Sequence, residues 1–126
     1  MRLVGGWLIV VGLSGCAGLP VEEMSVSGVG LSRAAVEAVV QDHAIQTRHC
    51  YENRLRDKPR LKGAAVLRWT VNMKGVTEDV NVKRGLDEKV DECLLAAVRS
   101  WTFPAPSARE KVLVTYPFVF APVRGN

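Results

Sequence analysis

The spacing of apolar residues after position 30 predicts two helices, each with one apolar stripe. Behind Ser32, a residue type favoured at helix N-caps, inward-facing positions recur at spacings of three and four as far as Cys50. This pattern predicts a helix of about 25 residues that ends before Pro59. Pro104 and Pro106 stop the second helix. The first stripe comprises Val36, Val40, His43, Thr47 and Cys50, and the second comprises Val90, Cys93, Leu94, Ala97 and Trp101.

Alternation of apolar and polar residues predicts three strands. Every second residue from Ala65 to Met73 is apolar, and a tight turn at Lys74-Gly75 follows. A second alternating segment, from Val76 to Val82, completes a hairpin. The last strand presents an apolar face made of Val112, Val114, Tyr116, Phe118 and Phe120.

The order helix, strand, strand, helix, strand predicts an α+β domain: a three-stranded antiparallel or mixed sheet with both helices on one face. The second and third strands are joined through a helix, so we expect them to run parallel with the first strand between them. The third strand then forms a sheet edge. Pro117 agrees with this position, because a proline inside a central strand would leave a ladder bond unmade.

The N-terminus has the features of a bacterial lipoprotein signal. Arg2 supplies the positive charge, Leu3 to Leu13 are mainly apolar, and the tetrapeptide that ends at Cys16 has the order of a lipobox. We therefore expect residues 1–15 to be removed, Cys16 to carry lipid, residues 16–30 to form a short tether and residues 31–126 to form the domain. By resemblance to bacterial lipoproteins, Ala17 after the cysteine, in place of Asp, implies the outer membrane, with the domain in the periplasm. An ordinary secretory signal and an uncleaved anchor are the alternatives.

Charge argues against nucleic acid as a partner. The chain has 17 basic and 13 acidic residues, and removal of Arg2 with the signal leaves a net charge of +3. The aromatic residues are not spaced like a base-stacking platform. The membrane, reached through the lipid anchor, and an envelope protein are the expected partners, and a homo-oligomer is compatible with the sequence.

Cys50 and Cys93 occupy the inward stripes of different helices, so we expect a disulfide between them in an exported domain. Closing a loop of about 44 residues would stabilise the fold by about 4 kcal/mol in the chain-entropy model. Two free buried thiols are the alternative. The absence of Cys-x-x-Cys argues against a redox site. His43 and His49 lack acidic partners for a metal site, so no metal and no cofactor are expected.

Basic residues alternate through the connection after the first helix: Arg54, Arg56, Lys58, Arg60 and Lys62. They form either a solvated loop or a patch that faces lipid phosphates or an acidic partner. At the start of the second helix, Asp87, Glu88, Asp91 and Glu92 favour the positive end of the helix dipole.

The large aromatic residues Trp69, Trp101, Phe103 and Tyr116 are expected in the core, with a ligand groove among them as the alternative. No catalytic residue pattern stands out: the chain has no Gly-rich phosphate loop, Ser-His-Asp arrangement or paired catalytic carboxylates. We therefore do not expect an enzyme.

Roughly residues 45–120 resemble the AgmX/PglI C-terminal domain, a family in the wider TonB C-terminal-like group. The resemblance rests on Cys50-Tyr51, Leu55, Pro59, Leu61, Gly63, Trp69, Gly75, Val76, Val90, Cys93, Leu94, Val98, Trp101, Phe103-Pro104-Ala105-Pro106 and Tyr116-Pro117-Phe118-Val119-Phe120. It implies the fold expected above and an envelope module that binds proteins, often by strand pairing, in transport or gliding motility. A lipobox and a short tether replace the transmembrane helix and Pro-rich spacer of a TonB energy transducer, so energy transduction is not implied.

Together these features predict a non-catalytic, lipid-anchored adaptor or accessory of an envelope complex. The expected docking site is the edge strand, with Lys111, Leu113 and Thr115 as its candidate residues. Coverage of this edge by a loop, the N-terminal tether or a second copy is the alternative. A structural accessory lipoprotein of a secretion or motility assembly and a ligand-binding lipoprotein are the alternative functions.

Overall fold

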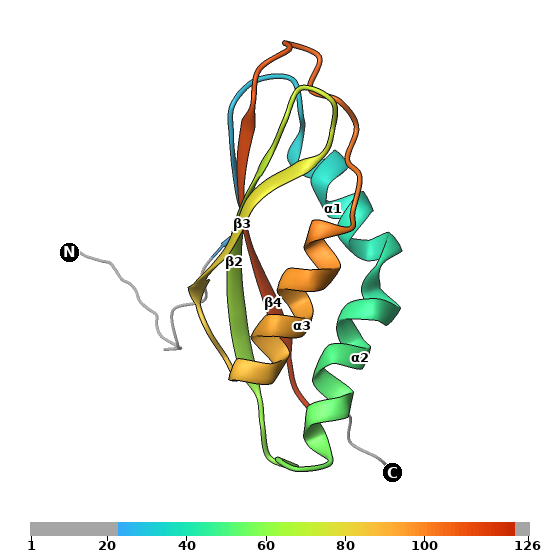
Figure 1. Ribbon diagram of the computed structural model, residues 1–126, viewed down its shortest axis with the longest axis vertical. Coiled ribbons are helices and arrows are strands. Elements are labelled where there is room, and N and C mark those ends of the chain that lie inside the picture. Colours follow the sequence, from blue (N-terminus) through green and yellow to red (C-terminus); the bar gives the residue numbers. More distant parts are fainter. Residues whose placement is uncertain (1–22, 123–126) are drawn as a thin grey trace, which may run out of the picture.

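The computed structural model describes residues 23–122 and shows an α+β domain whose helices cover one face of a four-stranded sheet (Figure 1). In the described part of the chain, the other face of the sheet carries no helix. In chain order, the elements are β1 (Ser25–Ser27), α1 (Arg33–Asp42), α2 (Ala44–Leu55), β2 (Gly63–Val71), β3 (Thr77–Arg84), α3 (Glu88–Arg99) and β4 (Val112–Phe120). The strand order in the sheet is β1-β4-β2-β3.

The central strand, β2, pairs antiparallel with β3 on one side and with β4 on the other. Strands β3 and β4 therefore run parallel with β2 between them, which confirms the predicted hairpin and strand order. The hairpin turn is held against the segment after α3, since the Phe103 N–H donates to the Gly75 carbonyl at 2.8 Å. Gly75 has a φ of +86°, and a Cβ there would collide with the Phe103 carbonyl oxygen, so the turn requires glycine.

The predicted α+β fold with its helices on one face of the sheet is confirmed, but the sheet has four strands, not three. The expectation that the last strand forms the sheet edge is wrong, because a short strand from the tether region adds to it. Residues Ser25–Ser27 form β1, which pairs antiparallel with Leu113–Thr115 of β4. Val26 lies opposite the buried Val114 and packs against the core, which gives this segment an apolar anchor. One apolar residue between two serines is too short an alternation for the sequence pattern to indicate a strand.

The predicted long first helix is two helices. Its apolar stripe is continuous, but His43 leaves the helical conformation with φ −108° and ψ 18° and separates α1 from α2. The His43 Nδ1 lies 2.8 Å from the Val39 carbonyl oxygen, and the ring stacks on Trp101 with 4.6 Å between the ring centroids. The residue at which the helix is interrupted thus contacts the core through its side chain.

The core lies between the helices and the sheet and is rich in aromatic rings. Trp69 is fully buried and meets Trp101 edge to face at 6.4 Å. Phe103 and Phe118 pack against the same ring at 5.9 and 6.4 Å. This confirms Trp69, Trp101 and Phe103 as core residues, as predicted. Tyr116 is only half-buried, at the margin of the core.

Candidate functional site

The outer side of β4 is covered along only part of its length. On its inner side, β4 pairs with β2 over the whole stretch from Val112 to Phe120. On its outer side, β1 pairs with Leu113–Thr115 alone. Among residues 23–122, no strand pairs with the outer side of the remaining stretch, from Tyr116 to Phe120. This stretch is an open edge that can accept a further strand.

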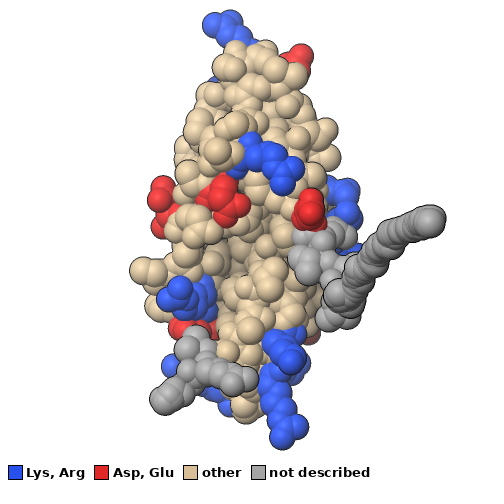
Figure 2. Space-filling model, turned by 180° about the vertical axis from the view of Figure 1, so that it is seen from behind, with Lys and Arg blue, Asp and Glu red and all other residues tan. Residues whose placement is uncertain are grey.

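A groove runs between this open edge and the first two helices. It consists of two adjoining cavities of about 250 Å³ and 330 Å³. Residues Ala44, Thr47, Val119 and Phe120 line both cavities, and we call the whole the β4 groove. Figure 2 shows a row of charged side chains across the upper half of this side of the molecule and, below it, a mainly uncharged surface with basic side chains on either side. The further lining residues are Val40, Gln41, Arg48, Tyr51, Glu52, Leu55, Tyr116, Pro117, Phe118 and Ala121.

The inner wall of the β4 groove is rigid and largely apolar. Tyr51 stacks on Phe120 with 4.9 Å between the centroids, and its hydroxyl donates to the Leu61 carbonyl. Burial raises the pKa of the Tyr51 hydroxyl. The Tyr116 hydroxyl donates to Glu37 at 2.7 Å, and its burial and the Glu37 carboxylate raise its pKa well above its ordinary value. Both tyrosines therefore remain neutral donors at physiological pH.

The outer rim of the β4 groove is polar and accessible. Arg48 and Glu52 are exposed and contribute one charge of each sign. Val119 is 63% exposed, an unusual position for a valine in a strand. An open strand edge beside an apolar wall with a polar rim is the arrangement that binds an extended peptide: the edge supplies main-chain hydrogen bonds and the wall accepts alternate side chains. Pro117 has no N–H and limits the number of donors on this edge.

The predicted docking residues do not lie on this open edge. Leu113 and Thr115 are in β4, but β1 occupies the outer side of the strand there. Thr115 is only 6% exposed, whereas Leu113 is 40% exposed. Lys111 precedes the strand, and its Nζ lies 3.2 Å from a Glu78 carboxylate oxygen. The outer edge of β4 is therefore unpaired within the described residues only in the later half of the strand. In the earlier half, β1 from the tether region pairs with it.

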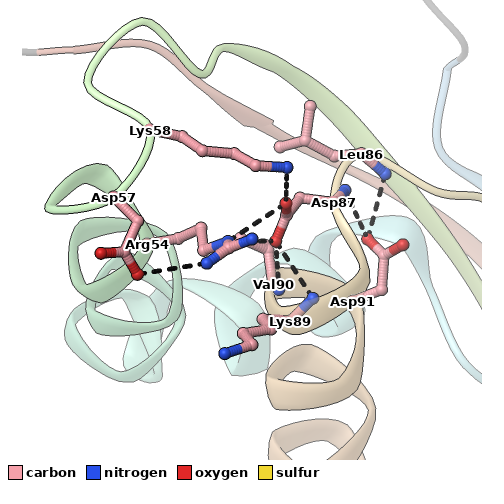
Figure 3. A network of polar contacts seen from close by, with 8 residues as sticks. All are labelled: Arg54, Asp57, Lys58, Leu86, Asp87, Lys89, Val90 and Asp91. Carbon is pink, nitrogen blue, oxygen red and sulfur yellow. Dashed lines mark hydrogen bonds and ion pairs between the residues drawn. The ribbon is translucent and has the colours of Figure 1, made fainter.

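Two of the five predicted basic-patch residues are engaged inside the molecule (Figure 3). Arg54 donates from Nε to both Asp87 carboxylate oxygens at 3.0 and 3.2 Å, and Lys58 donates to Asp87 at 2.7 Å. Arg54 also pairs with the exposed Asp57 at 3.2 Å. The remaining three residues, Arg56, Arg60 and Lys62, are exposed. The patch expected from sequence is therefore smaller, and part of it is a clamp between α2 and α3.

Asp87 does more than favour the helix dipole, which was its predicted role. Its side chain is 2% exposed and caps α3 by accepting from the Lys89 and Val90 N–H groups. Burial opposes the charged form, but hydrogen bonds from Lys58, Val90 and Arg54 outweigh it and hold the pKa of this carboxyl well below its ordinary value. Asp91 accepts from the Leu86 N–H at 3.0 Å and closes the same turn.

The predicted disulfide is present between Cys50 of α2 and Cys93 of α3, with 5.6 Å between the Cα atoms. Cys50 is buried as expected, whereas Cys93 is exposed, so the bridge lies at the surface seam between the two helices. A cavity of about 280 Å³ beside the bridge is lined by Cys50, Asn53, Arg54, Asp57, Lys89 and Cys93.

Cys16 lies outside the described residues. Within residues 23–122, no helix has the length and hydropathy needed to cross a membrane. The same part of the chain has no group of three His, Cys, Asp or Glu side chains placed to hold a metal ion.

Sequence reasoning did not find the β4 groove. One signal was present: Tyr51 follows Thr47, a member of the stripe that leads to Cys50, by four residues on α2 and lies outside that stripe. Through Tyr51, α2 therefore packs a second side against the sheet, at Phe120 of β4. The groove itself depends on how far β1 extends along β4, and the sequence pattern does not contain that length.

Comparison with known proteins gives one structural similarity. No protein-family model matches the chain, and no curated protein matches it. The chain is similar to the NMR solution structure of the TonB C-terminal domain of Helicobacter pylori (residues 179–285), with 14% sequence identity and a TM-score of 0.42. The similarity covers 75% of this chain and 92% of that one. The AgmX/PglI resemblance is not matched by any family model and stays a prediction.

Proposed function

We propose that this protein is a non-catalytic, lipid-anchored binding module of the bacterial cell envelope, and that it holds an extended segment of a partner protein in the β4 groove. One observation carries the proposal: within residues 23–122, no strand pairs with the outer side of β4 from Tyr116 to Phe120, and this stretch lies beside an apolar groove. Such a surface is a liability unless a partner covers it.

The contacts around the groove support a binding role for it. Its inner wall is fixed by the Tyr51–Phe120 stack and by the Tyr116–Glu37 hydrogen bond, so the groove is largely formed before a partner arrives. A preformed site lowers the entropic cost of binding. The partner would contribute one strand and alternate apolar side chains directed toward Thr47 and Tyr51.

The proposed location is the outer membrane, with acylated Cys16 as the anchor and the domain in the periplasm. Support comes from the lipobox and from the Cys50–Cys93 disulfide, since such bridges persist in oxidising compartments. The adaptor role follows from this placement: the chain would tie a partner of an envelope machine to the membrane. A second copy of this chain is one occupant that the binding experiment must distinguish.

Acylation is tested by metabolic labelling with a fatty-acid probe. The full chain should incorporate the label and partition with membranes, whereas Cys16→Ala should do neither, because the thioether acceptor is gone. Equal labelling of the two chains would remove the anchor from the proposal and leave the groove to be tested separately.

The groove is tested by site-specific crosslinking with a photoreactive residue at Val119, which is exposed on the open edge. The partner is identified by mass spectrometry of the crosslinked product in the native envelope. Ala44→Arg places a long charged side chain in both cavities and should reduce crosslinking by about tenfold, or roughly 1.4 kcal/mol. Ile45→Arg is the matched control. Ile45 is next to Ala44 in the chain, but it is 69% exposed and does not line the groove.

Two outcomes contradict the proposal. Undiminished crosslinking in a folded Ala44→Arg protein would mean that the groove is not the binding site. A product that consists of two copies of this chain would replace the adaptor role with self-association.

A further inference from the structure

The connection between α2 and β2 forms one end of the molecule (Figure 1). Its exposed basic residues are Arg56, Arg60 and Lys62, which we call the basic end. None of the three makes an ion pair within residues 23–122. Of the nearby carboxylates, Asp57 pairs with Arg54 and Asp87 pairs with Arg54 and Lys58, and the exposed Glu52 and Glu88 make no ion pair with the three basic residues. No ion pair within the described residues therefore neutralises the charge of Arg56, Arg60 or Lys62.

The basic end exposes charge without apolar surface. Leu61, the one large apolar residue between Arg56 and Lys62, packs against the core. None of the exposed large hydrophobic side chains of the described chain lies in this connection. Protein interfaces have an apolar centre, whereas the phosphates of lipid headgroups are attracted by basic side chains alone. The chemistry of this end thus favours an anionic lipid surface over a protein.

The direction of β1 brings the N-terminal side of the chain toward the same end. Strand β1 is antiparallel to β4, so the chain followed backward from Ser27 to Ser25 runs in the direction of Phe120. Ser25 lies opposite Thr115, and Gly63 lies opposite Phe120. The five residue steps from Thr115 to Phe120 span about 17 Å of strand. Lys62 directly precedes Gly63, so the basic end begins where that stretch stops.

The length of the tether fits this geometry. The nine residue steps from Cys16 to Ser25 reach at most about 32 Å. Passing the 17 Å of height between Thr115 and Phe120, without pairing with the open edge that the proposed function gives to a partner, leaves about 15 Å beyond the level of Phe120. A lipid on Cys16 therefore lies within reach of the membrane when the basic end touches the headgroups.

We propose that the basic end contacts the anionic phospholipid headgroups of the membrane that holds Cys16, and thereby sets the orientation of the domain. This inference rests on the lipid anchor of the proposed function. The strands run along the long axis of the molecule, which ends at the basic end (Figure 1), so the β4 groove stands upright on the membrane and is open from the side. Each basic residue near an anionic surface strengthens attachment about fivefold at low salt.

The test uses the full acylated protein in vesicles and measures the reactivity of its lysines toward an amine-acylating reagent by mass spectrometry. One set of vesicles contains phosphatidylethanolamine and phosphatidylglycerol, and the other contains zwitterionic phosphatidylcholine alone. Lys62 should be labelled several-fold less in the anionic vesicles, and high salt should remove the difference. Lys74, in the hairpin turn at the other end of the molecule, serves as the internal standard and should react equally in both (Figure 1).

Two double charge-reversal variants separate the effect of where the charges lie from the effect of the net charge. Arg56→Glu/Arg60→Glu should abolish the protection of Lys62. Arg33→Glu/Arg109→Glu makes the same change in net charge at the start of α1 and in the connection before β4, both at the opposite end, and should leave the protection intact (Figure 1).

The proposal is overturned if Lys62 of vesicle-bound protein reacts equally in the two vesicle types, or if both charge-reversal pairs act alike. Failure of the lipid anchor is recognised separately, because the protein would then not float with either vesicle. Failure of the groove is recognised by the Ala44→Arg crosslinking experiment, which does not involve the basic end.

Discussion

The two flanks of α2 differ in how completely the fold uses them. Toward α3, the helix is fixed by the Cys50–Cys93 bridge and by Arg54, which binds the buried Asp87. Toward β4, Ala44 and Thr47 line a groove that no strand of the described chain fills. The bonds that hold α2 to α3 therefore also fix the position of the α2 side chains that line the β4 groove. Changes on the fixed flank should therefore affect stability, and changes on the open flank should affect binding.

The largest expected effect is loss of the disulfide. Reduction, or the double substitution Cys50→Ala/Cys93→Ala, frees a segment with a sequence separation of 43 residues in the unfolded chain. This should lower the free energy of unfolding by about 4 kcal/mol. Urea denaturation with and without reductant measures the difference. The melting temperature should fall by roughly 4–8 °C per kcal/mol. Non-reducing peptide mapping must recover the Cys50–Cys93 pair; alkylation of both thiols without reductant would refute the assignment.

A smaller effect is expected from Asp87→Asn, which keeps a capping side chain for α3 but removes the charge that Arg54 and Lys58 share. Breaking a buried ion pair costs about 3–5 kcal/mol. We expect about 2 kcal/mol here, because the Lys58 side chain is 51% exposed and solvent screens its part. Asp57→Asn is the matched control: that side chain is 71% exposed and should contribute less than about 0.5 kcal/mol. Equal losses in the free energy of unfolding for the two variants would show that the Arg54–Asp87–Lys58 contacts do not stabilise the fold.

The same clamp predicts a pH dependence. The folded pKa of Asp87 lies below its unfolded value of about 3.9, so its contribution to stability is fully present above about pH 4. It is lost as the pH falls through the folded pKa, because the unfolded chain then binds a proton more readily. Denaturation curves between about pH 2 and 6 should converge for the wild type and Asp87→Asn at the acid end. A constant difference over this range would contradict the assignment.

The smallest change in stability is expected on the open flank. Ala44→Arg should alter the free energy of unfolding by less than about 0.5 kcal/mol, as for other accessible helix positions, while it reduces crosslinking from Val119. Ile45→Arg should alter neither quantity. If Ala44→Arg destabilises the domain as much as Asp87→Asn does, then the groove is part of the core packing and the contrast between the two flanks fails.

The comparison also shows what the sequence predicts and what it leaves out. Periodic patterns identified the hairpin, the strand order and the aromatic core around Trp69, because each depends on local alternation and on burial. The disulfide followed from two apolar stripes that had to meet. Asp87 was placed correctly at the start of α3, but its partners Arg54 and Lys58 lie 33 and 29 positions away and leave no periodic signal.

The remaining errors have specific physical causes. The break at His43 is hidden, because the stripe of α1 continues into α2 on the same side. The expected edge at Leu113 and Thr115 is covered by three residues whose only apolar member is Val26. The groove arises from a difference in strand length, since β4 continues to Phe120 whereas β1 spans Ser25–Ser27. Such lengths are set by tertiary pairing and not by local preference.

The placement of the bridge also limits how far the protein lengthens under mechanical load. A pull from the N-terminal side, directed toward the Phe120 end, loads β1 in shear. The residue pairs between β1 and β4 then bear the force together. Once β1, α1 and the first half of α2 have yielded, tension reaches Cys50 and passes directly to Cys93. The 43 residue steps between them, about 150 Å of extended chain, stay out of the force path. With the bridge intact, β2, β3 and the second half of α2 therefore cannot be drawn out by such a pull, and reduction would add the full length of the bridged loop to the extension.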